Sequence, residues 1–245
     1  MKKMRMRTVA AAGVALALTL AACGGGTKTG GGTTSGASGT FNAGLTKVFN
    51  ASGKKGGIIK FADEAAPDTL DPGETYYGYS WDFLRTYART LVMFKPAPGK
   101  EGLQLTPDLA EDLGKPSDGA KTWTYKIRKG VKFEDGTEVH AQDVKYAVLR
   151  STDKETFPVG PAYFDAMLNL PAGYKGPYKT PKMNTDSAIT TPDDYTIVFH
   201  LKQPFAGFDY LAQLPQTAPV PQKKDTGAKY KEHVVSSGPY MWSKY

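Results

Sequence analysis

Cysteine is almost absent from this chain of 245 residues, because Cys23 is the single one. With one cysteine, no disulfide can form within the chain. Histidine is also scarce, since the chain has three, and no two of them lie within 30 positions of each other. None of them belongs to an H-x-x-x-H or H-E-x-x-H pattern. The sequence therefore indicates no metal site built from histidine and cysteine.

Phosphate-binding and nucleophile motifs are missing as well. The sequence contains no G-x-x-x-x-G-K-[ST] loop and no G-x-S-x-G elbow. Its acidic pairs are adjacent in sequence, at Asp63-Glu64, Glu134-Asp135 and Asp193-Asp194, and the last two are expected in hairpin turns. A catalytic pair of carboxylates needs a set separation around its substrate instead. We therefore predict no enzyme activity and no bound cofactor.

Without its first 22 residues, the chain has no strong excess of positive or negative charge. The formal net charge is +7, but Lys2, Lys3, Arg5 and Arg7 contribute four positive charges to a segment without acids. The remaining chain has 27 basic and 24 acidic side chains, a net charge of +3. The basic character is thus largely a property of the N-terminal segment, and it gives no support for a nucleic-acid partner.

The longest apolar run is too short to cross a membrane as a helix, for which about 20 residues are needed. It covers the 14 residues from Val9 to Ala22, interrupted only by Thr19, and it follows the basic residues. This pattern is typical of a secretory signal peptide over residues 1–22. Leu20-Ala21-Ala22-Cys23 then resembles the lipobox of bacterial lipoproteins, in which the cysteine carries a diacylglycerol and becomes the first mature residue. The alternative is an ordinary secretory signal followed by an incidental cysteine.

Residues 23–55 are rich in Gly, Thr and Ser, and they have few apolar side chains that could offset the entropy of ordering. We interpret them as a flexible tether behind the lipidated Cys23. Two acyl chains supply the stable anchoring that one chain cannot. The predicted location is the outer face of the bacterial cytoplasmic membrane.

The folded part is predicted to start near Gly56 and to mix strands with helices. Residues 57–62 favour a first strand, and residues 122–127 alternate apolar and polar side chains as a half-buried strand does. Helical spacing runs from Ser80, the expected N-cap, to Leu91, and again over residues 140–150. Residues 186–201 predict a hairpin. The final stretch, 233–245, predicts a strand interrupted by Ser-Gly-Pro.

Aromatic residues are crowded into two loops. One loop holds Tyr76, Tyr77, Tyr79 and Trp81, and the other holds Tyr163, Phe164, Tyr174 and Tyr178. Such residues can fill a core. Tyrosine also offers a rigid apolar face with a polar tip, which suits the binding of varied ligands. Both interpretations remain open from the residues alone.

Five stretches together resemble the family 5 extracellular solute-binding proteins of ABC transporters, which include oligopeptide- and dipeptide-binding proteins. They are, in order, "DTLDP" (68–72), "LTPDLAEDL" (105–113), "DGAKTWTYKIRKGVKFEDGTEVHAQDVKYAVLR" (118–150), "DDYTIVFHLKQP" (193–204) and "SSGPYMW" (236–242). The long third stretch combines a hairpin turn at Asp135-Gly136 with a helix whose first turn holds Asp143, as the helix dipole favours. We interpret this stretch as scaffold.

The resemblance implies an α/β fold, a periplasmic-binding-protein-like two-lobed clamp with an extra inserted domain that closes on its ligand by hinge bending. It implies a partial lobe I over residues 56–75 and 190–245, with the smaller inserted α/β domain over 76–189. Members of the family run to more than twice this length, so the second main lobe is expected to be absent. Half a cleft is expected to have little affinity by itself.

The resemblance also implies the function and the site. The chain would capture oligo- or dipeptides and deliver them to the permease subunits of an ABC importer, without changing them chemically. The ligand-binding candidates are Glu64, Ala65, Tyr76, Tyr77 and Tyr240, which match the cleft-lining parts of the family. The alternatives are nickel or haem complexes or oligosaccharides as ligands, a receptor for peptide pheromones, and, from a different class, a lipid-anchored hydrolase.

Overall fold

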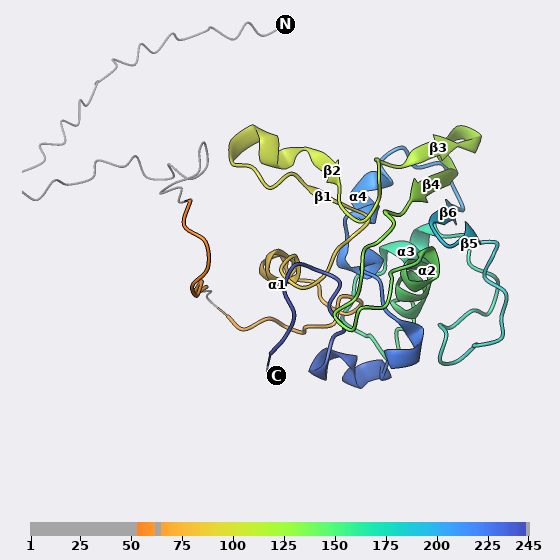
Figure 1. The fold of residues 1–245 in the computed structure, drawn as a ribbon. Coiled ribbons are helices and arrows are strands. Elements are labelled where there is room, and N and C mark those ends of the chain that lie inside the picture. Colours follow the sequence, from red (N-terminus) through yellow and green to blue (C-terminus); the bar gives the residue numbers. More distant parts are fainter. Residues whose placement is uncertain (1–52, 62–64, 244–245) are drawn as a thin grey trace, which may run out of the picture. The chain divides into compact units, whose positions relative to one another are not determined.

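The computed structural model describes residues 53–61 and 65–243. Four predicted features lie outside the described residues: the signal peptide, lipid attachment at Cys23, most of the tether and the candidate Glu64. The predicted mixed α/β class is confirmed, because helices and antiparallel sheets both occur in the folded part (Figure 1).

The main sheet has four antiparallel strands in the order β3-β4-β6-β5. These strands are β3 (Lys115–Ser117), β4 (Thr122–Lys126), β6 (Thr196–His200) and β5 (Ile189–Asp193). The two central strands pair with Trp123 opposite Phe199 and Tyr125 opposite Ile197. All four of these side chains are buried, whereas their neighbours in sequence are more exposed. The alternation over 122–127 and the hairpin within 186–201 are therefore confirmed, and both put one face of the sheet into the core.

Aromatic rings fill the core on that face. The Phe199 ring lies 5.0 Å from the Phe208 ring and 6.4 Å from the Phe164 ring, measured between centroids. Phe208 immediately precedes α4 (Asp209–Ala212), and Phe164 belongs to α3 (Tyr163–Met167). The rings thus join the sheet to both short helices.

The longest helix, α2 (Ala141–Arg150), packs on β5 and β6. Its start follows the predicted pattern, because the backbone N–H of His140 donates to the Asp143 carboxylate at 2.9 Å. Such a bond satisfies a donor at the N-terminus that has no partner within the helix. Val144 and Val148 are fully buried, as expected from their spacing. This helix is confirmed.

A smaller part of the fold contains α1 (Gly78–Leu84) and a two-stranded sheet of β1 (Val92–Phe94) and β2 (Leu105–Pro107). Short 3-10 helices cover residues Gly99–Leu103, Asp118–Ala120, Pro215–Thr217, Gln222–Lys224 and Gly227–Glu232. The predicted boundary between residues 189 and 190 falls within β5, which pairs with β6 in the same sheet as β4. The division into a partial lobe and an inserted domain stays a prediction.

The predicted first strand at residues 57–62 is wrong over its described part. Gly57 lies at a bend, residues 58–61 have no regular secondary structure, and none of them pairs with a strand among the described residues. Ile58 is 88% exposed and Phe61 is 71% exposed. A strand needs a neighbour for its backbone hydrogen bonds, so its β-branched composition alone does not form one here.

The predicted long helix from Ser80 to Leu91 is also wrong in its extent. The α1 helix begins at Gly78, so Ser80 lies inside it and its hydroxyl donates to the Asp68 carboxylate at 2.6 Å. The helix ends at Leu84, where the turns tighten: the backbone N–H groups of Thr86 and Tyr87 donate to the carbonyl oxygens of Phe83 and Leu84, three residues back, at 3.0 Å each. The Thr86 oxygen accepts from the backbone N–H of Tyr240, at 2.9 Å.

The predicted strand over residues 233–245 is not formed over the described residues 233–243. The segment instead docks on the turn after α1, where the N–H groups of Ser237 and Gly238 both donate to the Tyr87 carbonyl oxygen at 3.0 and 2.9 Å. A Cβ atom on Gly238 would lie 2.5 Å from the Tyr87 backbone carbon, so the close approach requires glycine. Figure 1 shows this C-terminal segment passing beside α1.

Candidate functional site

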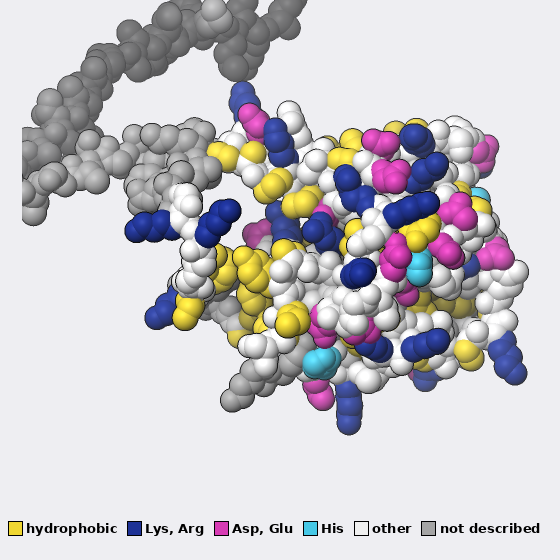
Figure 2. Space-filling view, in the orientation of Figure 1, with side chains coloured by type: hydrophobic (Ala, Val, Ile, Leu, Met, Phe, Trp, Pro, Cys, Tyr) yellow, Lys and Arg dark blue, Asp and Glu magenta, His cyan; other side chains and the backbone are white. Residues whose placement is uncertain are grey.

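The predicted site residues that the structure describes lie near α1 but do not share one hollow. Ala65 lines a hollow of about 290 Å³ together with Tyr79 and Phe83. Tyr240 lines a second hollow, of about 580 Å³, on the other side of Phe83. Side chains of α1 and of the turn after it therefore form a wall common to both hollows. Figure 2 shows hydrophobic side chains gathered in this part of the surface, next to the described N-terminal segment.

Tyr76 and Tyr77 precede α1 and are half exposed, at 50% and 51%. Their loop is held by the Asp68 carboxylate, which accepts from the Thr75 hydroxyl at 2.8 Å and from the Tyr76 backbone N–H at 3.2 Å. The Tyr77 ring stacks on Tyr79 with 5.5 Å between centroids. Two of the candidate tyrosines are thus presented to the surface by a well-bonded loop.

The two aromatic loops meet at Tyr76. A hydrogen bond with the Tyr76 hydroxyl raises the pKa of Tyr163, which was predicted in the second loop and is the first residue of α3. The loops also touch through their backbones, since a Cβ atom on Gly160 would lie 2.5 Å from the Gly73 carbonyl oxygen. Among the aromatic residues of the two predicted loops, Phe164 is buried and fills the core. Tyr76, Tyr77 and Tyr163 are exposed and do not.

A buried ion cluster lies beneath this loop. The Arg150 guanidinium is fully buried and forms two bonds with the Asp71 carboxylate, at 2.7 and 2.8 Å. Its Nε donates to Asp225 at 3.0 Å. Tyr178 and Tyr146 both donate their hydroxyl groups to the same Asp225 carboxylate. The cluster joins the loop before α1 to the end of α2 and to the segment near residue 225.

Charge and burial compete in this cluster. Burial raises the pKa of Asp225, but the Arg150 charge and the tyrosine hydrogen bonds outweigh it and lower the pKa overall. The Phe157 and Tyr230 rings cover the guanidinium, with centroids 4.3 and 4.9 Å from its carbon. This cluster was not predicted from the sequence. Asp71 lies in the first family-like stretch and Arg150 ends the third, but nothing in the sequence indicated that they form a pair.

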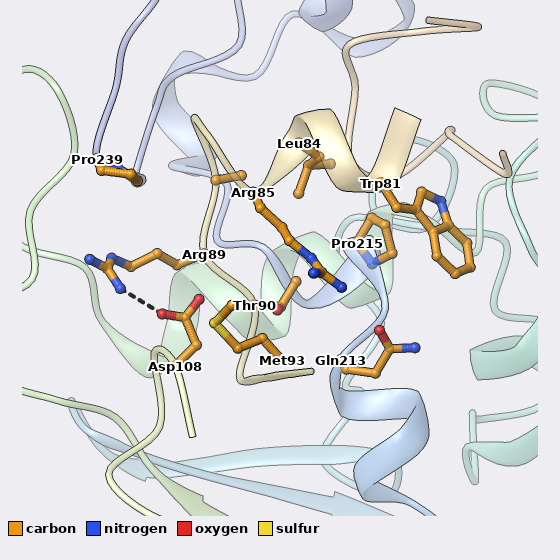
Figure 3. Close-up of a pocket in the computed structure, with 11 residues that line it drawn as sticks. Trp81, Leu84, Arg85, Arg89, Thr90, Met93, Asp108, Gln213, Pro215 and Pro239 are labelled. Carbon is orange, nitrogen blue, oxygen red and sulfur yellow. Dashed lines mark hydrogen bonds and ion pairs between the residues drawn. The ribbon is translucent and has the colours of Figure 1, made fainter. Parts of the chain in front are cut away.

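A third hollow, which we call the α1 hollow, lies on another face of the same helix (Figure 3). Its volume is about 190 Å³, and its walls come from α1, the following turn, β1, the residue after β2, and the segments near residues 213 and 239. Its lining includes Trp81, Leu84, Arg85, Arg89, Asp108 and Gln213. None of the four described candidates, Ala65, Tyr76, Tyr77 and Tyr240, lines it, although Pro239 belongs to the predicted Gly-Pro-Tyr stretch.

The charged groups of the α1 hollow differ in how they are held. The Arg89 guanidinium donates to the Asp108 carboxylate at 2.5 Å. Burial raises the pKa of Asp108, and the neighbouring Arg89 offsets this only in part. Arg85 Nη1 lies 3.9 Å from Oδ1 of Asp82, whose side chain is 78% exposed. The hollow therefore combines apolar walls with two cations and one well-held carboxylate, which suits the binding of a polar ligand group.

The histidines are scattered in the fold as they are in the sequence. The His140 ring packs edge-on against Tyr195, and His200 Nε2 lies 3.4 Å from the Thr190 hydroxyl. His233 Nε2 lies 3.4 Å from a carboxylate oxygen of Glu134. Within residues 53–61 and 65–243, no group of three or more His, Cys, Asp or Glu side chains is placed to hold a metal ion. The same residues contain no helix with the length and apolarity needed to traverse a bilayer.

Comparisons with known proteins agree on one relationship. The profile described as "Bacterial extracellular solute-binding proteins, family 5 Middle" matches residues 104–245. The probable D,D-dipeptide-binding periplasmic protein DdpA of Escherichia coli K12 is 30% identical over 197 residues, which are 76% of this chain and 34% of that protein. The periplasmic oligopeptide-binding protein OppA of the same strain is 34% identical over 125 residues, which are 49% of this chain and 23% of that protein.

Solved structures extend the match across most of the chain. The clavulanic acid biosynthesis oligopeptide binding protein 2 has 42% identity and a TM-score of 0.79, over 83% of this chain and 36% of that one. A Listeria monocytogenes OppA bound to peptide has 23% identity and a TM-score of 0.58, over 72% of this chain and 34% of that one. At this low identity, the likeness shows the fold alone. The chain spans about a third or less of the length of these proteins.

Proposed function

Because the chain belongs to the family 5 bacterial extracellular solute-binding proteins, we propose that it is part of a receptor that captures peptides for an ABC importer. The observation that carries this proposal is the extended structural match to an oligopeptide binding protein. In this function, the receptor holds oligo- or dipeptides outside the cytoplasmic membrane and delivers them to the permease subunits. The ligand is bound and released without covalent change.

The surface around α1 supports peptide capture. It offers tyrosine rings at Tyr76 and Tyr77, apolar side chains such as Phe83, and charged groups at Arg85 and Asp108. Such a mixture suits a ligand with a repeating polar backbone and variable side chains. We assign Ala65, Tyr76, Tyr77 and Tyr240 to the ligand surface, together with Glu64. Closure over this surface would follow the hinge bending of two-lobed receptors.

The experiment that tests this function identifies what the receptor carries. The gene is expressed in its own frame, including any coding sequence that continues after codon 245, and the purified protein is denatured to release its ligand. Mass spectrometry is expected to find peptides of two or more residues. Added peptide mixtures are expected to raise the unfolding temperature, since a ligand that binds only the native state stabilises it. Release of metal complexes or sugars without peptides would contradict the proposal.

We also propose that Cys23 carries the diacylglycerol and anchors the receptor to the outer face of the cytoplasmic membrane. This proposal rests on the basic segment, the apolar run and the lipobox-like residues before Cys23. A tether of about 30 residues behind the anchor would keep the receptor at a high local concentration near its permease.

The Cys23→Ala variant is expected to lose the lipid, because the sulfur that carries it is gone. Cell fractionation and intact mass should show a protein that is released from the membrane or that retains residues 1–22. A matched control, Thr27→Ala, lies in the tether and should partition and be processed as the unchanged protein is. Membrane retention of Cys23→Ala at the mature mass would show that the anchor is something else.

A further inference from the structure

The α1 hollow contains one cation more than its own carboxylate can neutralise. Arg89 and Asp108 form a close pair at 2.5 Å, and the Asp108 side chain is only 12% exposed. Arg85 has no comparable partner among the described residues, because its nearest carboxylate oxygen is that of Asp82, at 3.9 Å. Exposed ion pairs at such a distance contribute little to stability, so the Arg85 charge remains available to a ligand.

The surroundings of Arg85 favour an anionic ligand group. Figure 3 shows its side chain pointing into the hollow, toward Gln213 on the opposite wall. One N–H of the Gln213 amide donates to the Tyr210 carbonyl oxygen at 3.2 Å. The carbon atoms of Trp81, Leu84 and Pro215 line the space between them. Apolar walls reduce the number of competing waters, and they therefore strengthen an ionic hydrogen bond within the hollow.

The size of the hollow limits what it can hold. About 190 Å³ is too little for a peptide, but it accommodates one end group or one side chain. A guanidinium presents two parallel N–H donors that match the two oxygens of a carboxylate. Within the proposed peptide-binding function, on which this inference rests, a carboxylate can come from the C-terminus or from an Asp or Glu side chain.

We propose that the α1 hollow binds a carboxylate group of the peptide ligand and that Arg85 is the residue that selects it. Arg89 supports this role indirectly, because its pairing with Asp108 keeps that carboxylate from neutralising Arg85. The hollow thereby sets a preference among peptides, while the tyrosine-lined surface before α1 accepts the rest of the chain.

The test uses two random tetrapeptide libraries that differ only at the C-terminus, one with free carboxylates and one with amides. Each is incubated with the expressed protein described above, and the bound fraction is measured by mass spectrometry. Selection of the C-terminal carboxylate predicts at least tenfold enrichment of the free-acid library over the amide library. Selection of a side chain predicts instead that Asp- and Glu-containing amides are enriched tenfold over their Asn and Gln counterparts.

The variants assign the preference to Arg85. Arg85→Gln should reduce the enrichment to below about threefold while peptides still bind, and Arg85→Lys should retain part of it. Lys115→Gln removes one positive charge from the exposed strand β3 and should leave the enrichment unchanged. Equal binding of acids and amides by the unchanged protein, or full enrichment in Arg85→Gln, would overturn the inference while leaving peptide capture intact. Failure of both libraries to bind would contradict the proposed function itself.

Discussion

Replacing Arg150 with leucine should lower the free energy of unfolding by about 3–5 kcal/mol. The guanidinium is fully buried between Asp71 and Asp225, whose side chains are each 1% exposed. Leucine would fill part of the space but would leave two carboxylates in the interior without a cation. Removal of one member of a buried ion cluster is costly for that reason, even where the intact cluster adds little net stability.

Urea-induced unfolding, followed by tryptophan fluorescence, measures this change. Arg85→Leu serves as the matched control, because the same substitution is made at a partly exposed arginine with a distant partner. Its expected effect is within about 0.5 kcal/mol. A loss below about 1 kcal/mol for Arg150→Leu would mean that water or a rearranged side chain satisfies the two carboxylates, and it would refute the role assigned to the cluster.

The second large effect is expected for Phe208→Ala, which should cost about 3–5 kcal/mol of unfolding free energy. The Phe208 ring is fully buried and lies 5.0 Å from Phe199 and 5.8 Å from Trp123, between centroids. Truncation would remove these contacts and leave a cavity at the junction of the sheet and α4. Close-packed interiors relax only in part around such a cavity.

Tyr210→Ala is the matched control for this second measurement. Tyr210 lies two residues further along, within α4, and is 56% exposed. Its truncation should cost less than about 1 kcal/mol, because the ring has little contact area to lose. Comparable losses at both positions would indicate that α4 itself unfolds in the variants, and the packing explanation for Phe208 would then fail.

Elements with a local signal were predictable from the sequence. The strand around Tyr125 shows its alternation within a few residues, and the helix ending at Arg150 shows both its N-terminal pattern and its buried stripe. Each of these signals comes from side chains that are close in sequence and belong to the same helix or strand. The hairpin turn and the helix start within the long family-like stretch were predictable for the same reason, since both are local features.

Features that need distant partners were not predictable. Residues 57–61 have the composition of a strand, but a strand also needs a neighbour, and residues 237–240 dock through backbone bonds that leave no pattern in their side chains. Asp71 and Arg150 are 79 positions apart, so their pairing had no sequence signature. The α1 hollow draws its lining from several separate segments, and it was missed for the same reason.

The candidate site residues stay a prediction, but the structure places the described ones near a common helix. The loops around Ala65 and Tyr76 and the stretch near Tyr240 all lie next to α1, as a shared surface requires. Their contact with a ligand stays a prediction. The charged groups that give this surface its proposed selectivity, above all Arg85, lay inside a predicted helix and carried no signal that distinguished them from ordinary solvated residues.

The buried cluster around Arg150 also limits how this protein can change over evolutionary time. A substitution at Arg150 alone passes through an intermediate with two carboxylates in the interior and no cation, and one at Asp71 or Asp225 leaves the buried guanidinium without part of its hydrogen bonds. Because natural proteins are stable by only about 5–15 kcal/mol, few lineages would survive that intermediate. The three positions are therefore expected to be retained together or replaced together, so that the cluster behaves as one inherited unit while the tyrosines exposed above it remain free to diversify.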